Sequence, residues 1–187
     1  MKSVKKSWTF RLLSRFARDK RGISAVEFAF VAPLMITMYL GVVEVSDGVA
    51  ADRKVTLTAG ALANLTAQSQ TLVTADMTNI FNASTAILKP YSTSNLTATV
   101  SCIKIDSTGK ATIAWSATSG GTARAVGSGA AIPAALAVPS TSLVWSEVAY
   151  AYTPIVGYTI TGTLNLTDQM FMSPRQTPPT YNGLSCS

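Results

Sequence analysis

The chain has 187 residues, of which 48% are hydrophobic and 13% are charged. This composition is too apolar for a disordered chain, and the charged fraction is about half that of an ordinary soluble protein. Histidine is absent, which excludes histidine-based catalytic triads and histidine-ligated metals, and two cysteines are too few for a zinc site. The composition therefore predicts no metal and no cofactor.

The net charge of +6 is concentrated at the amino end of the chain. Residues 1–21 carry a net charge of +7, and the other 166 residues carry a net charge of −1. The body of the protein therefore has no basic stripe and is not expected to bind nucleic acid. Trp8, Leu12 and Phe16 recur at every fourth position of the basic block. This block is either a helix that lies on an anionic inner leaflet or an ordinary basic lead-in with accidental periodicity.

An apolar run from Ile23 to Val43 follows the basic block, and Glu27 is its only ionisable residue. In a helix these 21 positions span about 31 Å, the thickness of the hydrocarbon core of a bilayer. Because the excess of lysine and arginine precedes the run, we expect the amino end in the cytoplasm and the remainder outside. The sequence therefore predicts a single membrane-spanning helix.

Three interpretations of this helix are open. A cleaved secretory signal would end at a small-residue site such as Val49-Ala50-Ala51, although its apolar region is normally shorter. A plain signal anchor fits the length and the orientation. It leaves Glu27 unexplained, because a carboxylate in a membrane span costs several kcal/mol unless it is paired or protonated. The third interpretation accounts for Glu27 and for the residues that precede the run.

The third interpretation rests on Lys20-Arg21-Gly22, followed by Ile23 and by Glu27 at the fifth position after the glycine. This pattern resembles the processing site of type IV pilins and pseudopilins. The resemblance implies that prepilin peptidase cuts between Gly22 and Ile23 and that the apolar helix stays on the mature protein. It also implies that the new ammonium of Ile23 neutralises Glu27 of a neighbouring subunit, which would satisfy a buried charge. A glycine at the cut lets the backbone approach the peptidase closely.

Further residues resemble the TadE/TadG-like proteins of tight-adherence (Flp) pili: the stretch Ala25–Leu34, then Gly41 and the acidic Val43-Glu44-Val45. The resemblance covers residues 20–50 closely and residues 51–187 more loosely. It implies a minor pseudopilin of the bacterial inner membrane, in or at the base of a pilus used for surface adhesion. The implied partners are the membrane, prepilin peptidase, other pilins and pseudopilins, and the pilus assembly platform. The length suits the TadE-like members, but these residues do not separate TadE from TadG roles.

Helices are predicted to continue beyond the apolar run. The membrane helix extends over residues 47–66, and the polar segment 68–70 interrupts it. A second helix begins with Thr74 as N-cap and Asp76 in its first turn, and Lys89-Pro90 ends it. The apolar stripe of this helix is interpreted as core packing rather than as a cofactor-binding motif. It consists of Met77, Ile80, Phe81, Ser84, Ile87 and Leu88.

Strands are predicted in the carboxyl-terminal half. Residues 96–102 alternate apolar and polar side chains, as a half-buried strand does. The alternation then slips, with Ile103 and Ile105 on the opposite parity, which indicates a bulge. Asp106–Lys110 reads as a hairpin turn. The remaining predicted segments are a strand over residues 111–115, a long loop over 118–142, and strands over 148–152, 158–166 and 170–172.

Together these elements predict an α+β fold. A long amino-terminal membrane-spanning helix continues into a periplasmic helix, and a small antiparallel β-sheet domain follows. The expected parts are a cytoplasmic leader, the membrane helix, the periplasmic helices and the β domain. They occupy residues 1–22, 23–43, 44–90 and 91–187.

The two cysteines are candidates for a disulfide. Cys102 lies in a predicted strand, and Cys186 follows it by 84 positions. If joined, they would stabilise the domain by about 4–5 kcal/mol in the chain-entropy model, and an oxidising periplasm would permit the bond. Two unpaired thiols remain the alternative, because the sequence gives no distance between them.

No catalytic motif stands out. Ser101–Lys104 and Ser107–Lys110 match the pattern Ser-x-x-Lys, but acyl-transfer chemistry needs this spacing on a helix, and these lie in a strand and a turn. The aromatic residues of the β segment form either a binding face or, as we favour, the core: Trp115, Trp145, Tyr150 and Tyr152. We therefore expect a non-enzymatic protein without a small-molecule substrate. A signal-anchored envelope enzyme and a cleaved secreted binding protein are the rival classes.

Overall fold

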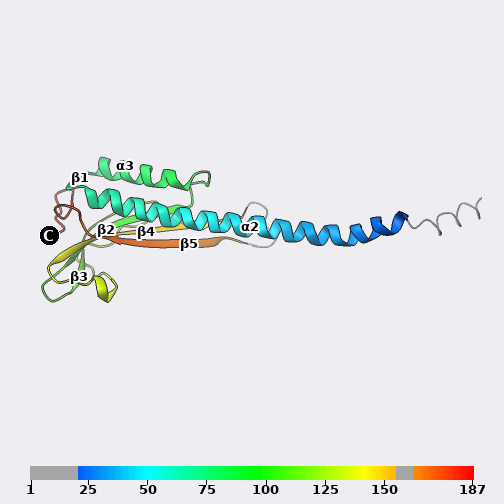
Figure 1. Cartoon of the computed structure of the whole chain (residues 1–187). Coiled ribbons are helices and arrows are strands. Elements are labelled where there is room, and N and C mark those ends of the chain that lie inside the picture. The colour runs from blue at the N-terminus through cyan, green and yellow to red at the C-terminus, as the bar shows by residue number, and fades with distance from the viewer. Residues whose placement is uncertain (1–20, 155–161) are drawn as a thin grey trace, which may run out of the picture. The chain divides into compact units, whose positions relative to one another are not determined.

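The computed structural model describes residues 21–154 and 162–187 (Figure 1). The chain divides into two compact units between Val43 and Glu44. The first described element, helix α2 (Arg21–Gln68), contributes residues to both units. The part Gly22–Val43 is called the apolar segment below, and the unit Glu44–Ser187 is called the folded domain.

The apolar segment is helical throughout and buries none of its large apolar side chains. The exposed fractions of its exposed side chains range from 40% at Val43 to 79% at Phe30. An 18-residue window of α2 has a mean hydropathy of 1.9, and none of that window is buried. Length and composition would thus let the helix cross a membrane, and the predicted long apolar helix is confirmed.

The part of α2 that belongs to the folded domain buries one face. Its buried residues recur at spacings of three and four, as in a helix that packs on one side. They are Glu44, Ala51, Val55, Thr58, Ala59, Leu62, Ala63, Thr66 and Ala67. The helix ends at Gln68, two residues beyond the predicted end, so it includes the first residue of the predicted polar interruption 68–70.

A short second helical segment follows α2. After β1 (Thr71–Leu72) come α3 (Thr74–Thr85) and the 3-10 helix η1 (Ala86–Leu88). The predicted N-cap is wrong by one residue, because Val73 is the N-cap and its N–H donates to the carboxylate of Asp76 at 3.1 Å. The hydroxyl of Thr74 instead accepts a hydrogen bond from Asn182 at 3.1 Å.

Four antiparallel strands form the sheet in the order β3-β2-β4-β5. They are β2 (Leu96–Ile105), β3 (Ala111–Ser119), β4 (Thr141–Tyr152) and β5 (Leu164–Met172). The predicted antiparallel sheet is confirmed, and the loop between β3 and β4 contains η2 (Ala134–Leu136).

The strand prediction after β4 needs one correction. The segment 170–172 is not a separate strand, because β5 pairs with β4 without a break from Leu164 opposite Tyr152 to Met172 opposite Val144. Part of the strand predicted over 158–166 lies outside the described residues. A two-residue parallel pairing of β1 with β6 (Thr180–Tyr181) was not predicted.

The predicted bulge is confirmed, and the structure shows which strand carries the extra residue. Cys102 pairs with Trp115 and Ile103 pairs with Ile113, so Ala114 of β3 has no partner in β2. Ile103 lies in a second apolar cluster that is separate from the main core, and residues of the β3–β4 loop pack against this cluster. The shift of the apolar positions from even to odd numbers therefore marks the point where β2 begins to bury the face opposite the main core.

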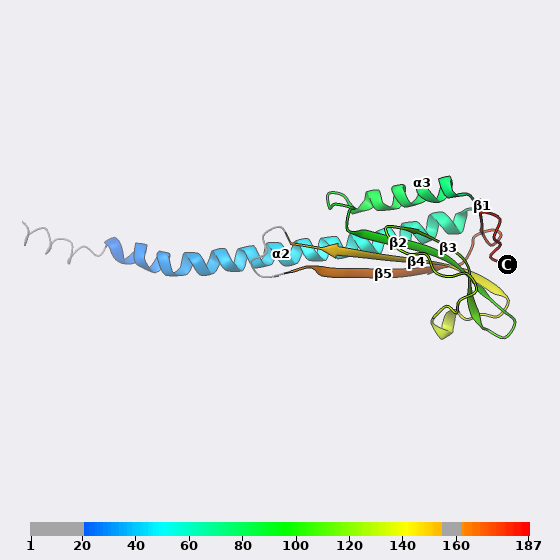
Figure 2. The ribbon, with the colours of Figure 1, turned by 180° about the vertical axis from the view of Figure 1, so that it is seen from behind.

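The main core lies between the sheet and the two helices, which run beside the strands (Figures 1 and 2). Trp115 is fully buried there, and its indole N–H donates to the carbonyl of Pro179 at 2.9 Å. The hydroxyl of Ser146 in β4 donates to the carbonyl of Ala59 in α2 at 2.7 Å. A disulfide joins Cys102 to Cys186, with the Cα atoms 5.9 Å apart, and fastens the tail to β2.

Candidate functional site

The residues of the predicted processing site lie in the apolar segment of α2. Gly22, Ile23 and Glu27 are helical and exposed. A Cβ atom added to Gly22 would meet no atom within 4 Å, so the fold itself does not require a glycine there. Glu27 follows Ile23 by four positions, which places the two residues on the same face of the helix.

Glu27 makes no ion pair and no side-chain hydrogen bond within the part of the chain that the structure describes. It is surrounded along the helix by exposed apolar side chains, among them Ile23 at 52%, Phe28 at 69% and Phe30 at 79% exposure. A carboxylate in such surroundings needs a partner when the apolar surface is covered by lipid or by protein. The apolar segment therefore exposes an apolar surface whose one carboxylate, that of Glu27, needs a partner when this surface is covered.

Buried and half-buried polar groups mark the start of the folded domain. Glu44 is 3% exposed. One turn later, the hydroxyl of Tyr91 lies within hydrogen-bond distance of two oxygens of Asp47, the backbone carbonyl at 3.2 Å and the carboxylate at 3.3 Å. The Tyr91 ring meets the Tyr152 ring edge to face, with ring centroids 6.0 Å apart. Burial, reinforced by the charge of Asp47, raises the pKa of Tyr91 above its ordinary value of 10.0. These contacts fix the first turns of the domain's helix to the sheet.

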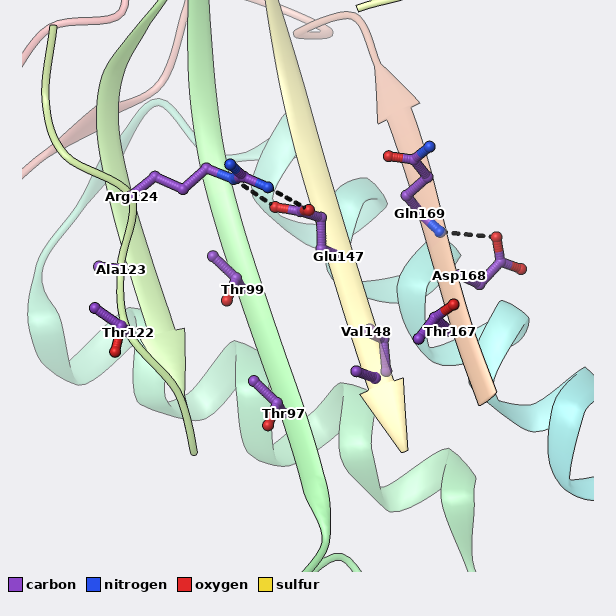
Figure 3. A pocket seen from close by; sticks show the side chains of 11 residues that line it. Thr97, Thr99, Thr122, Ala123, Arg124, Glu147, Val148, Thr167, Asp168 and Gln169 are labelled. Atoms are coloured by element: carbon purple, nitrogen blue, oxygen red, sulfur yellow. Dashed lines mark hydrogen bonds and ion pairs between the residues drawn. The ribbon is translucent and has the colours of Figure 1, made fainter. Parts of the chain in front are cut away.

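A polar groove of about 690 Å³ crosses the outer face of the sheet (Figure 3). Threonines of β2 and β5 line it, together with Glu147 of β4 and the segment 122–124 of the β3–β4 loop. Arg124 donates from Nε and Nη2 to the two carboxylate oxygens of Glu147, at 2.7 and 2.6 Å. The guanidinium also lies 4.1 Å from the centroid of the Trp145 ring.

The Arg124–Glu147 pair ties the loop to the sheet. Its hydrogen bonds to Glu147 raise the pKa of Arg124, so the guanidinium is charged. The side chains are 41% and 29% exposed, so solvent screens much of the attraction between them. The indole N–H of Trp145 donates to the side chain of Gln169 at 3.1 Å, which links β4 to β5. These contacts join the β3–β4 loop, β4 and β5 beside the groove.

The groove can make polar contacts, but it lacks the parts of an acid–base site. Its carboxylates are engaged: Glu147 holds Arg124, and Asp168 accepts from Thr56 and from the backbone N–H of Gln169. Among the described residues, no three His, Cys, Asp or Glu side chains gather closely enough to hold a metal ion. The arrangement therefore supports contact with a polar surface rather than proton transfer.

The structure places the residues singled out in the sequence in separate regions. Gly22, Ile23 and Glu27 belong to the apolar segment, whereas Cys102 and Cys186 are fully buried in the folded domain. The aromatic residues are at most 6% exposed, which confirms that they are core rather than a binding face: Trp115, Trp145, Tyr150 and Tyr152.

The Arg124–Glu147 wall of the groove was not foreseen. Arg124 is the only charged residue between positions 118 and 142, in a stretch of small and polar residues. A charge in an exposed loop is ordinarily solvated, so its position alone does not signal a partner. The partner itself lies 23 positions further along the chain, and sequence spacing does not identify it.

Comparison with known proteins finds one match. Residues 22–63 match the family model described as TadE-like protein. The match covers the apolar segment and most of the remainder of α2, whereas the β-sheet lies outside the matched residues. No curated protein and no solved structure matches the chain. The match confirms the resemblance to the TadE-like family and is consistent with a protein of the tight-adherence pilus system.

Proposed function

We propose that this chain is a minor pseudopilin that supports assembly of a tight-adherence pilus and is not an enzyme. The observation that carries the proposal is the TadE-like match over residues 22–63, which begins at the glycine of the predicted processing site. In this proposal prepilin peptidase cuts between Gly22 and Ile23, the apolar segment spans the inner membrane, and the folded domain lies in the periplasm. Other pilins and the assembly platform are its partners.

The surroundings of Glu27 support the same proposal. Its carboxylate lies on an apolar helix and has no partner within the described chain. Cleavage after Gly22 removes the +7 block that would hold the helix at the inner leaflet. It also creates an ammonium at Ile23, which pairs with Glu27 of a neighbouring copy when apolar helices bundle.

Two rival functions remain. A cleaved secreted binding protein would begin near Ala51 and would lose Glu44 and Asp47, although Asp47 holds Tyr91 and Glu44 is buried in the folded domain. A signal-anchored enzyme would keep Met1, and it would need an acid–base cluster that the described residues of the sheet groove do not supply.

The amino-terminal sequence of the protein from the membrane fraction separates these possibilities. A chain that starts at Ile23 supports the pseudopilin. A start at Met1 indicates a plain anchor, and a start near Ala51 indicates a secreted form; either result would contradict the proposal.

Gly22→Ala tests the processing step in cells that make the pilus. We expect cleavage to fall sharply, because the added methyl group blocks close approach of the peptidase to the backbone. The matched control is Gly60→Ala, since a Cβ atom there also meets no atom within 4 Å and Gly60 lies in the same helix. Normal cleavage of Gly22→Ala would count against a prepilin-type site.

A further inference from the structure

Beyond the apolar segment, α2 keeps an exposed stripe that the fold leaves uncovered. Val45 is 52% exposed, Val49 is 47% exposed, and Asp52 is exposed as well. These positions are four and three residues apart. The same alternation runs back along the sequence through Val42 and Met38, which are 64% and 65% exposed. A repeat of four and three residues is the spacing of a coiled-coil seam.

Lipid does not account for the outer end of this stripe. If the membrane span ends at Val43, Val49 lies about 9 Å further along the helix. The headgroup layer on each side of a bilayer is only about 5–8 Å thick. Val49 would therefore be an exposed valine beyond the lipid, and Asp52 lies almost one turn further on.

The rest of the helix surface at this level is occupied. The sheet covers the face that carries Ala51 and Val55, which are fully buried. On another side, Lys54 donates from Nζ to the carbonyl of Ile87 at 3.1 Å. Thr56 donates to Asp168 of β5, which closes the stripe at its outer end. The exposed residues of α2 at this level form one sector, which contains Val45, Val49, Asp52, Arg53 and Leu57.

A shallow groove of about 510 Å³ lies beside the open sector. Val45, Val49, Arg53 and Leu57 of α2 line it, together with Ile87. The exposed side chains of Val45 and Val49 and the groove beside them belong to one copy of the chain. In a pair of copies, the valines of each copy can therefore pack into the groove of the other, as a self-complementary interface requires.

The charges on the stripe are self-complementary too. Asp52 and Arg53 are both exposed, and within the described residues neither makes an ion pair or a side-chain hydrogen bond. If Val49 occupies the a position of a heptad, Asp52 is at d and Arg53 is at e. In a parallel pair a d side chain packs against the e residue of the partner, so Asp52 of each copy meets Arg53 of the other.

We propose that two copies of this chain pair in parallel along the stripe Val45–Val49–Asp52 of α2. The parallel orientation rests on the proposed function, because copies inserted in one membrane with one topology run the same way. The pairing buries Val45 and Val49, of which Val49 lies beyond the lipid, and neutralises Asp52 and Arg53 across the interface.

Cysteine cross-linking in native membranes tests the pairing. The only two cysteines of the chain are joined to each other, so Val49→Cys introduces a single free thiol. The matched control is Val73→Cys, because Val73 is 49% exposed, close to the 47% of Val49, and lies at the start of α3 outside the stripe and the groove. Under mild oxidation we expect about tenfold more disulfide-linked dimer with Val49→Cys than with Val73→Cys. Equal yields, or cross-links from Val49→Cys to a different protein, would overturn the proposal.

A charge exchange gives an independent measurement. In the Val49→Cys background, Asp52→Arg should lower the dimer yield about fivefold, because two arginines then face each other across each side of the seam. Adding Arg53→Asp exchanges the two charges and should restore the yield. Failure of the double exchange to restore it would contradict the assigned pairing.

The outcome is separable from that of the proposed function. A mature chain that starts at Ile23 but gives no Val49→Cys dimer overturns only the pairing. A dimer formed by chains that still start at Met1 overturns only the processing.

Discussion

Two parts of one helix, α2, differ in whether the protein itself buries their apolar side chains. In the apolar segment, residues 22–43, the large side chains are left uncovered by the chain itself. In residues 44–68 one face carries Ala51, Val55 and Leu62, all fully buried against the sheet. Secondary structure is the same in both parts, so the helix alone does not decide which surface is covered. The folded domain covers one face of residues 44–68, whereas the described residues leave the large apolar side chains of the apolar segment uncovered.

This difference shows that the distribution of apolar residues around a helix depends on what surrounds the helix. An amphipathic pattern appears where one side meets water, as in residues 44–68. A helix that is apolar on all sides, as residues 22–43 are, is typical of a segment of which no side faces water. Changes in the folded domain should therefore alter its free energy of unfolding, whereas comparable changes in the apolar segment should not.

Removal of the disulfide is the largest expected perturbation of the folded domain. The bond spans 84 positions, and its loss in Cys102→Ala/Cys186→Ala should lower the free energy of unfolding by about 4–5 kcal/mol. The measurement is chemical denaturation of the full chain in detergent, followed by near-ultraviolet circular dichroism. Membrane retention should be unchanged, because the bond lies entirely within the folded domain.

The wild-type chain under reducing conditions provides the control for this variant. Reduction should reproduce most of the loss without any change of sequence. If the double variant and the reduced chain both unfold at the wild-type denaturant concentration, the disulfide does not hold the tail against β2 in the way described.

A pair of leucine substitutions compares the two parts of α2 directly. Leu62 is fully buried in the folded domain, so Leu62→Ala should lower the free energy of unfolding by about 3 kcal/mol through lost burial and a cavity. Leu34 is 62% exposed in the apolar segment, so Leu34→Ala should leave the unfolding of the folded domain unchanged. Both are measured by the same denaturation. Equal effects would mean that the two units unfold together.

Sequence reasoning found those elements of this fold that depend on neighbours in the chain. The apolar run predicted the membrane-length helix, and Asp106–Lys110 predicted the hairpin, in which the Asp106 carboxylate accepts the N–H of Thr108 and of Lys110 at 2.8 and 2.9 Å. The break in alternation after Cys102 predicted the bulge. In each case the signal and the structure lie within a few residues of each other.

Features that depend on distant residues were missed. The β1–β6 pair consists of two residues on each side, 109 positions apart, and is too short to leave a pattern. The residue type of Thr74 favours an N-cap, but its hydroxyl accepts a hydrogen bond from Asn182 instead. The groove on the sheet depends on Arg124 reaching Glu147 across the outer face. Local sequence carries no information about such partners.

The smallest expected effect concerns the contact that fixes the start of the folded domain. The pKa of Tyr91 is raised above 10.0, first by burial and then by Asp47, so the folded chain holds this proton more tightly than the unfolded chain. The resulting stabilisation is fully present below pH 10 and is lost as the pH rises above 10 through the folded-state pKa. Tyr91→Phe should therefore reduce the alkaline fall of the melting temperature between pH 9 and pH 11, while lowering it slightly at pH 7 through loss of the hydrogen bond. Some alkaline dependence should remain, because burial also raises the pKa of Tyr150 and of Tyr152.

Asp47→Asn serves as the companion variant, since it keeps the backbone acceptor and a side-chain oxygen near the Tyr91 hydroxyl but removes the negative charge. It should reduce the slope less than Tyr91→Phe does, because burial is the larger cause of the shift. If Tyr91→Phe leaves the slope between pH 9 and pH 11 as it is in the wild type, folding does not raise the pKa of Tyr91.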